Sequence, residues 1–169
     1  TLYCLDSNTG GGLWSFEASA RAIWAAPTFF KGRVYVASTD GRVYVIHAET
    51  GELPSDAVYT GTELSASPLL VADVPSGSGT RATMFLTLGS PAMEIRAYDA
   101  LTGEDLWSEV GSLDQASSAS ATYHMEFNRV IVGDNSGTWY SFDAETGLRM
   151  WSYRSSMPVG NFTTASCMG

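Results

Sequence analysis

The fold is decided by the nine residues at positions 99–107, Asp99-Ala100-Leu101-Thr102-Gly103-Glu104-Asp105-Leu106-Trp107. The same order of Asp, Thr-Gly and Trp recurs in residues 6–14 and 143–151. A degraded copy begins at His47, which replaces the Asp, and has Ser55 where the Trp is expected. Successive copies of the glycine stand 41, 52 and 44 residues apart, at Gly10, Gly51, Gly103 and Gly147. A period of this length indicates an array of small repeated units.

Each Thr-Gly follows a run of β-branched and aromatic residues that suits a β-strand. Turn sequences such as Thr39-Asp40-Gly41 separate the runs, and Asp-Gly between two alternating runs is a strong hairpin signal. Each unit is therefore expected to be a four-stranded antiparallel meander. The three strands before each Thr-Gly are expected at residues 23–30, 33–38 and 42–47, then 64–72, 83–89 and 94–99, and finally 117–124, 129–134 and 138–143.

The absence of a helical stripe and of any run of 18 apolar residues predicts an all-β chain without direct membrane insertion. Four-stranded blades that repeat every 40 to 50 residues predict a β-propeller. The expected parts are the end of a leading blade (1–17), three complete blades (23–60, 64–111 and 117–154) and the first strand of a following blade (160–169). The second blade is lengthened by residues 73–81, a Gly/Ser/Pro-rich stretch expected to be an exposed, mobile hairpin extension.

The Asp-x-x-Thr-Gly-x-x-x-Trp pattern resembles the tryptophan-docking motif of the pyrroloquinoline-quinone-type (PQQ-like) propellers. The resemblance implies that each Trp packs against the Thr-Gly turn of the neighbouring blade, and that Ser55 breaks this girdle at one junction. Members of the family close with seven or eight blades, so the chain is expected to be about half of a ring, completed by further blades or by another protein chain. The expected docking residues are Trp14, Trp107 and Trp151 with Gly10, Gly51, Gly103 and Gly147.

The formal charge of −9 and the single lysine, Lys31, disfavour nucleic acid as a partner, because its recognition needs clustered cations. Cys4 and Cys167 are read either as small buried residues or as a disulfide or reactive thiol. Asn161 lies in an N-glycosylation sequon, whose use the sequence leaves open, and no segment indicates a compartment.

The same family contains quinoprotein dehydrogenases. The resemblance implies that such an enzyme covers its quinone with an adjacent Cys-Cys disulfide, supports it with a Trp, and holds Ca²⁺ with Glu, Asn and Asp. This sequence has no Cys-Cys pair and no carboxylate cluster at the inner-strand ends, and Trp24 is the one candidate for a supporting ring. His47 and His124 are isolated from other metal-ligand residues. We therefore expect no catalytic residues, no cofactor and no metal site.

Two functions remain open at this point. A non-catalytic scaffold or protein-interaction module is favoured, because groups repeated in every unit indicate a structural role. The alternative is a portion of a quinoprotein dehydrogenase whose cofactor site lies in further blades. For the first, the connections between blades and the turns between second and third strands should share one face, which we call the connection face. The candidate partner contacts on it are Arg21, Trp24, Glu63, Asp114 and Gln115.

Overall fold

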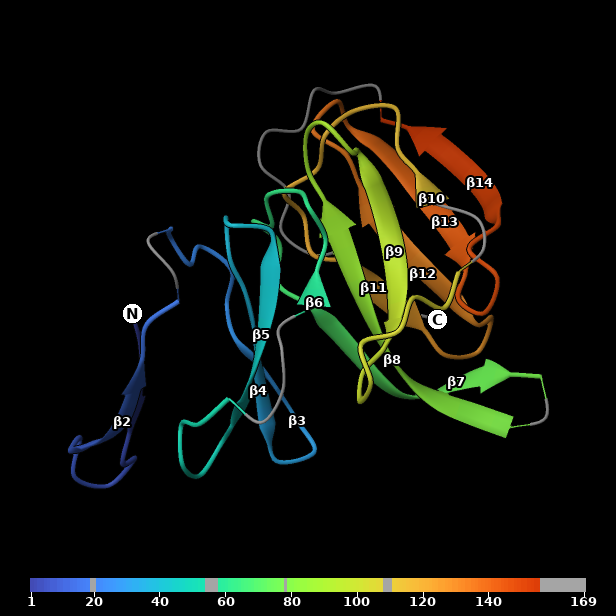
Figure 1. Cartoon of the computed structure of the whole chain (residues 1–169). Helices are drawn as coiled ribbons and strands as arrows, with labels where there is room; N and C mark the ends of the chain where they lie inside the picture. Colours follow the sequence, from blue (N-terminus) through green and yellow to red (C-terminus); the bar gives the residue numbers. More distant parts are fainter. Residues whose placement is uncertain (19–20, 54–57, 78, 108–110, 156–169) are drawn as a thin grey trace.

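The computed structural model describes residues 1–18, 21–53, 58–77, 79–107 and 111–155, and everything below refers to these residues. Within them the chain forms fourteen strands, arranged as one two-stranded and three four-stranded antiparallel sheets. Figure 1 shows the sheets side by side in chain order, like part of a fan. The described residues contain no helix that is long and apolar enough to cross a membrane. The predicted all-β class with four-stranded antiparallel blades is confirmed.

Each sheet is a meander, in which every strand pairs with the next one along the chain. The leading pair consists of β1 (Leu2–Leu5) and β2 (Gly12–Phe16). The first blade contains β3 (Thr28–Phe30), β4 (Arg33–Ala37), β5 (Arg42–His47) and β6 (Val58–Tyr59). The second contains β7 (Leu69–Ser76), β8 (Gly79–Leu88), β9 (Glu94–Asp99) and β10 (Gly111–Ser112). The third contains β11 (Thr122–His124), β12 (Arg129–Gly133), β13 (Thr138–Asp143) and β14 (Arg149–Arg154).

The innermost strands begin about five residues later than the sequence predicts, at Thr28, Leu69 and Thr122. In the segments before the first two of these strands, backbone amides donate to the next blade instead of within a sheet. The backbone N–H of Ala26 donates to Ser67 Oγ at 3.0 Å, and that of Ser67 donates to Ser120 Oγ at 2.9 Å. Serine hydroxyls thus replace the ladder partners that this stretch would need as a strand.

Two tryptophans join neighbouring blades in the same way. The indole N–H of Trp14 donates to the carbonyl oxygen of Ala48 at 2.9 Å, and that of Trp107 donates to the carbonyl of Ala144 at 3.1 Å. Each accepting carbonyl lies three residues before a Thr-Gly glycine. A Cβ added at Gly51 would lie 2.8 Å from two atoms of the Trp14 ring, so only glycine allows this contact.

Apolar side chains fill the space between adjacent blades and form the core. Trp14 and Phe16 pack against Val36, Tyr44 and Ile46 between the leading pair and the first blade. The other two clusters join the first blade to the second and the second to the third. They are centred on Tyr35, Val43, Val45, Met84, Leu86 and Tyr98, and on Phe85, Ile95, Trp107, Val130, Tyr140 and Phe142.

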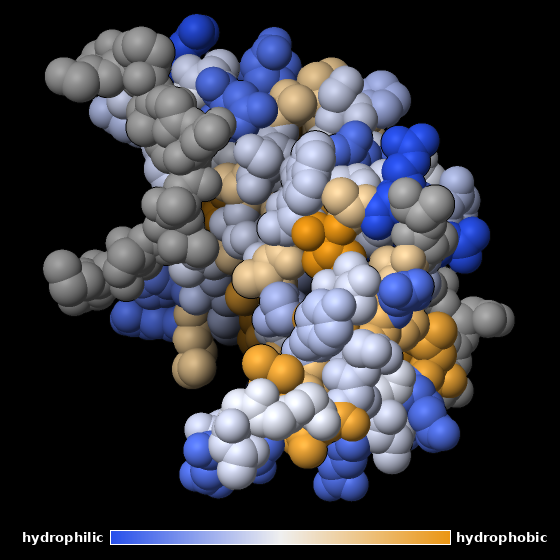
Figure 2. Space-filling view, turned by 90° about the vertical axis from the view of Figure 1, so that its left-hand side faces the viewer, coloured by the Kyte–Doolittle hydropathy of each residue, from blue (hydrophilic) through white to orange (hydrophobic). Residues whose placement is uncertain are grey.

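The outer faces of the array are exposed at both ends. All six residues of β14 are exposed, and Trp151 keeps 47% of its surface accessible. At the other end Leu5 and Leu13 are 57% and 62% exposed, and Figure 2 shows apolar residues at the surface on this side of the molecule. The docking role of Trp151 therefore stays a prediction, because its turn partner would belong to a following blade.

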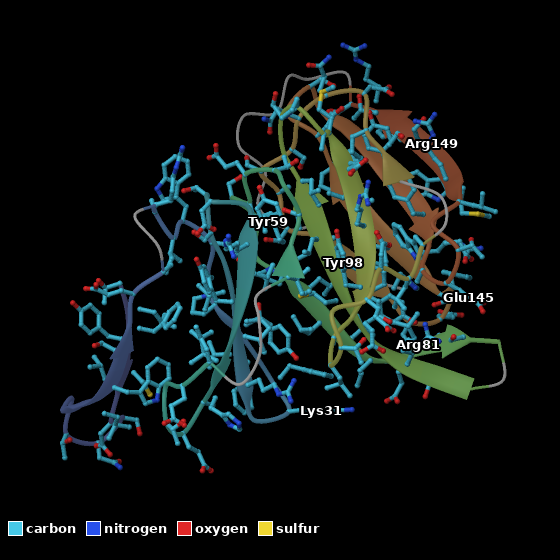
Figure 3. All side chains as sticks on the ribbon, in the orientation of Figure 1. Lys31, Tyr59, Arg81, Tyr98, Glu145 and Arg149 are labelled. Atoms are coloured by element: carbon cyan, nitrogen blue, oxygen red, sulfur yellow. The ribbon has the colours of Figure 1, made fainter. Side chains whose placement is uncertain are left out.

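The extension of the second blade is a mostly exposed hairpin, as its composition predicts, but it is built from strand residues. Residues 73–76 continue β7, and 79–81 begin β8. Val74 is 2% exposed and packs in the cluster between the second and third blades, which ties the hairpin to the core. The N–H of Gly77 also donates to Glu145 Oε1 of the third blade at 2.6 Å, and Figure 3 labels Glu145 beside this hairpin.

Cys4 lies half-buried in β1 as a free thiol. Cys167, the sequon at Asn161 and the expected strand at 160–169 lie outside the described residues.

Replacing Trp107 with Ala should lower the free energy of unfolding by about 3–5 kcal/mol, because a buried indole and its hydrogen bond are lost from a blade junction. Trp24 is 70% exposed, so the matched change Trp24→Ala should cost less than about 0.5 kcal/mol. Urea denaturation of both variants measures the difference. Equal losses from the two substitutions would contradict the docking role of Trp107.

Candidate functional site

All five candidate contacts on the connection face are exposed. Arg21 and Trp24 precede the inner strand of the first blade, Glu63 precedes that of the second, and Asp114 and Gln115 precede that of the third. Trp24, at 70% exposure, presents an indole to solvent. These positions come from connections, which surround a rigid scaffold and are therefore free to vary in chemistry.

A cavity of about 200 Å³ opens between the second and third blades and includes Glu63. It brings together one carboxylate, several hydroxyls and one amide, which suits hydrogen bonding to a polar ligand or peptide. The lining residues are Glu63, Ser65, Gly89, Ser90, Ala116, Ser117, Ser118 and Asn135. Ser117 Oγ already donates to the carbonyl of Gly133 at 2.6 Å. The hydroxyls better placed to bond a ligand are therefore those of Ser65, Ser90 and Ser118.

These serines were not predicted from the sequence, although the register of the repeats contains a signal for them. The hydrogen bonds between inner segments align Ala26 with Ser67 and Ser120, so Trp24 occupies the position of Ser65 and Ser118. The first blade therefore presents an indole where the next two present hydroxyls. Aligning the inner segments as well as the Thr-Gly turns would have found the site.

Asp114 is fixed at the rim of this face by the third blade. Its carboxylate lies 3.6 Å from Arg149 Nη1, and its backbone N–H donates to the hydroxyl oxygen of Tyr140 at 3.0 Å. Tyr140 in turn donates its O–H to Asp134 Oδ2 at 2.8 Å. Burial, together with the bond to Asp134, raises the pKa of Tyr140 to about 12, so this tyrosine stays a donor at physiological pH. Figure 3 shows Arg149 on the outer side of the third blade.

Asp134 is the fully buried anchor of this network. Burial alone raises the pKa of a carboxyl, but hydrogen bonds from Ser136, Thr138 and Tyr140 outweigh burial and hold the pKa of Asp134 below its usual value. The carboxylate therefore shapes the turn between β12 and β13, which carries Asn135 into the cavity.

The described residues do not fit the quinone and calcium site that the family resemblance implies. The cavity offers a single carboxylate, from Glu63, and among the described residues no three His, Cys, Asp or Glu side chains gather as a metal site. The sequence also lacks an adjacent Cys-Cys pair. The site built by these residues is a surface for hydrogen bonding, with one exposed aromatic ring.

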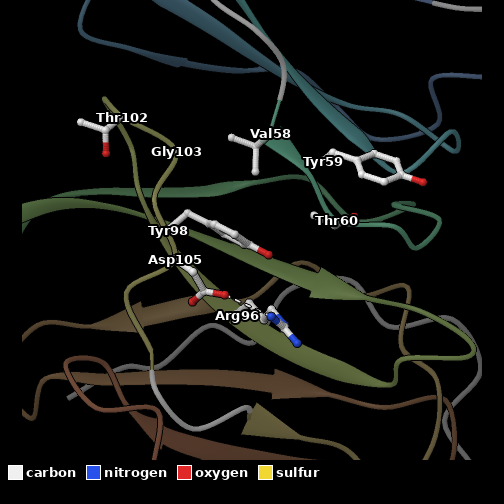
Figure 4. Close-up of a pocket in the computed structure, with 8 residues that line it drawn as sticks. All are labelled: Val58, Tyr59, Thr60, Arg96, Tyr98, Thr102, Gly103 and Asp105. Atoms are coloured by element: carbon white, nitrogen blue, oxygen red, sulfur yellow. Dashed lines mark hydrogen bonds and ion pairs between the residues drawn. The ribbon is translucent and has the colours of Figure 1, made fainter.

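A second cavity, of about 490 Å³, opens at the junction between the first and second blades. This is the junction at which the sequence lacks a docking Trp. Ser55 lies outside the described residues, but Val58 of β6 places its Cγ2 2.8 Å from where a Cβ of Gly103 would lie. Figure 4 shows the cavity between β6 and the Thr102–Gly103 turn, with Tyr98 and Arg96 below it.

A comparison with known protein families agrees with the family indicated by the docking motif. The model of the PQQ-like family described as outer membrane protein assembly factor BamB matches residues 1–165. The chain belongs to this family.

Solved structures and one curated sequence resemble the chain more distantly. BamB from Moraxella catarrhalis has a TM-score of 0.66 at 21% identity, covering 89% of this chain and 42% of that one. A quinohemoprotein alcohol dehydrogenase from Pseudomonas putida HK5 has a TM-score of 0.68 at 18% identity, covering 92% of this chain and 31% of that one. A beta-alanine-activating enzyme of Danio rerio is 33% identical over 76 residues, 41% of this chain and 6% of that protein. The chain thus spans less than half the length of each of these proteins, and the structural likenesses show the fold alone.

Asp134→Asn should lower the free energy of unfolding at pH 7 by about 3 kcal/mol, because buried donors lose a charged acceptor. Since the folded-state pKa of Asp134 lies below the unfolded value, its contribution is present above about pH 4 and is lost as the pH falls through the folded pKa. The difference in free energy of unfolding between wild type and Asp134→Asn should therefore become smaller in acid. Asp114→Asn, at an exposed carboxylate, is the matched control in urea denaturation at both pH values. A gap that stays constant with pH would contradict the ionised role of Asp134.

Proposed function

We propose that this chain is a non-catalytic interaction module that binds a protein partner through its connection face. The observation that supports the proposal most is Trp24, an indole left 70% exposed on the same face as Glu63, Asp114 and Gln115. Tryptophan is enriched among the residues that dominate binding energy at protein interfaces. The family description names an assembly factor, which is in keeping with a propeller that acts by contact rather than by chemistry.

The charge of the chain indicates what kind of partner fits. Its formal charge is −9, and Glu63 and Asp114 add carboxylates on the connection face. A partner with basic residues around an apolar pocket for Trp24 would be complementary in charge and shape. Protein association would then be faster at low salt, because the steering charges are exposed.

A second function, a portion of a quinoprotein dehydrogenase, is suggested by the enzymes of the PQQ-like family and by Trp24, the candidate for a supporting ring. In that case the chain would be part of a larger enzyme and Trp24 would support a quinone. The carboxylate set for the accompanying cation would then have to come from outside the described residues. A dye-reduction assay separates the two functions. Full-length protein is mixed with quinone, Ca²⁺ and an alcohol or aldose, and only a dehydrogenase would oxidise the substrate and reduce the dye.

Replacing Trp24 by a photoreactive benzoylphenylalanine in the full-length protein should yield a cross-link to one polypeptide in cells of the native host. The same photoreactive residue at Asn8, which is exposed in the Thr-Gly turn of the leading pair and lines neither cavity, should not link to that polypeptide. Purified full-length protein should show no quinone-dependent turnover. The proposal is wrong if no polypeptide is linked specifically from position 24, or if robust dye reduction occurs.

A further inference from the structure

The junction between the first and second blades departs from the other two at two positions that act together. In each third strand, the residue three positions before the repeat's Asp or His faces the preceding blade. It is Tyr44 in the first blade and Tyr140 in the third, but Arg96 in the second. The blade that faces Arg96 is also the one that lacks the docking Trp. This junction therefore lacks both the docking indole and the tyrosine at this third-strand position.

Among the described residues, two smaller contacts stand where the docking Trp would be. The Tyr35 hydroxyl donates to the carbonyl of Ala100 at 2.6 Å, which is the acceptor equivalent to Ala48 and Ala144. Val58 covers Gly103, as Trp14 covers Gly51. Because an isopropyl group is much smaller than an indole, the cavity of about 490 Å³ remains open beside it. This volume lies in the range of ligand pockets.

The walls of the cavity suit a flat aromatic group with one donor. The ring of Tyr98 is only 6% exposed and belongs to the core, so the accessible wall is Arg96, whose side chain is 34% exposed. The guanidinium of Arg96 is held by Glu94 at 2.6 Å and by Asp105 at 3.0 Å. The Asp105 side chain is still 40% exposed, so its carboxylate remains accessible as an acceptor at the mouth of the cavity.

We propose that this cavity receives a tryptophan side chain from a partner polypeptide. The inference rests on the proposed function, since it names a second point at which the partner is held. An indole can stack on the exposed guanidinium of Arg96 while its N–H donates to the carboxylate of Asp105. A tryptophan is the favoured occupant because indoles of this chain already fill the equivalent positions at the other two junctions.

The first test uses the blocked pentapeptide Gly-Leu-Trp-Ser-Phe, the sequence of β2 that carries Trp14. It is titrated into ¹⁵N-labelled full-length protein and followed by NMR. Saturable shifts are expected at the amides of residues 58–60 and 96–105. The peptide with Ala in place of Trp should cause no saturable shift. Equal shifts from both peptides, or shifts confined to other regions, would overturn the inference.

The second test closes the cavity from within. Val58→Trp supplies the chain's own indole and should weaken peptide binding at least tenfold, whereas Ser15→Trp, which adds an indole on β2, should leave it unchanged. Asp105→Ala should weaken binding several-fold and keeps the test decisive if Val58→Trp fails to fold. Unchanged binding in both cavity variants would overturn the inference. A cross-link from position 24 without peptide binding would refute the cavity alone, and peptide binding without that cross-link would refute the connection face alone.

Discussion

The contact between an indole of one blade and the Thr-Gly turn of the next is the interaction on which the array depends. The Asp, the Gly and the Trp that recur in each repeat have separate structural roles. Asp143 Oδ1 accepts the N–H groups of Glu145 and Thr146 and so closes the turn. The glycine adopts a positive φ and leaves room for a ring, and the Trp donates its N–H to the carbonyl three residues before that glycine. Two sheets are thereby held in register by one side chain.

The degraded copy shows which part of the motif can be lost. With His47 in place of Asp, the turn keeps its backbone bond from Gly51 N–H to the His47 carbonyl at 2.9 Å, close to the 2.8 Å between Gly103 and Asp99. The turn therefore survives without the carboxylate. Loss of the Trp has a larger effect, because Tyr35 takes over the hydrogen bond but not the volume. The result is a cavity at a junction that remains joined by the core around Met84 and Leu86.

Local signals in the sequence predicted the elements that depend on local chemistry. The third strands, Arg42–His47, Glu94–Asp99 and Thr138–Asp143, have the bounds expected, since a hairpin turn and a Thr-Gly turn delimit each one. The inner strands are shorter than expected, and in the first two blades an amide before the strand donates to a serine hydroxyl of the next blade. The hairpin extension at residues 73–81 is exposed as expected, but the burial of Val74 was not predicted, because it depends on the next blade. Both differences arise from contacts between blades.

The same reason limits what the sequence said about function. It placed Glu63 and Trp24 on one face, but the cavity around Glu63 needs turns from two blades to be seen together. The sequence also identified Ser55 as a break in the girdle of tryptophans. That Tyr35 takes over the hydrogen bond of the missing Trp, and that Arg96 stands where the other blades have a tyrosine, could be seen only from the structure.

The central claim, that Trp14 and Trp107 lock neighbouring blades, is tested most directly by hydrogen exchange of the indole N–H groups in ¹⁵N NMR spectra, assigned by Trp→Phe substitution. The indole protons of Trp14 and Trp107 should exchange much more slowly than that of Trp24, because each donates to a backbone carbonyl across a junction. Exchange at Trp14 and Trp107 as fast as at Trp24 would contradict the account.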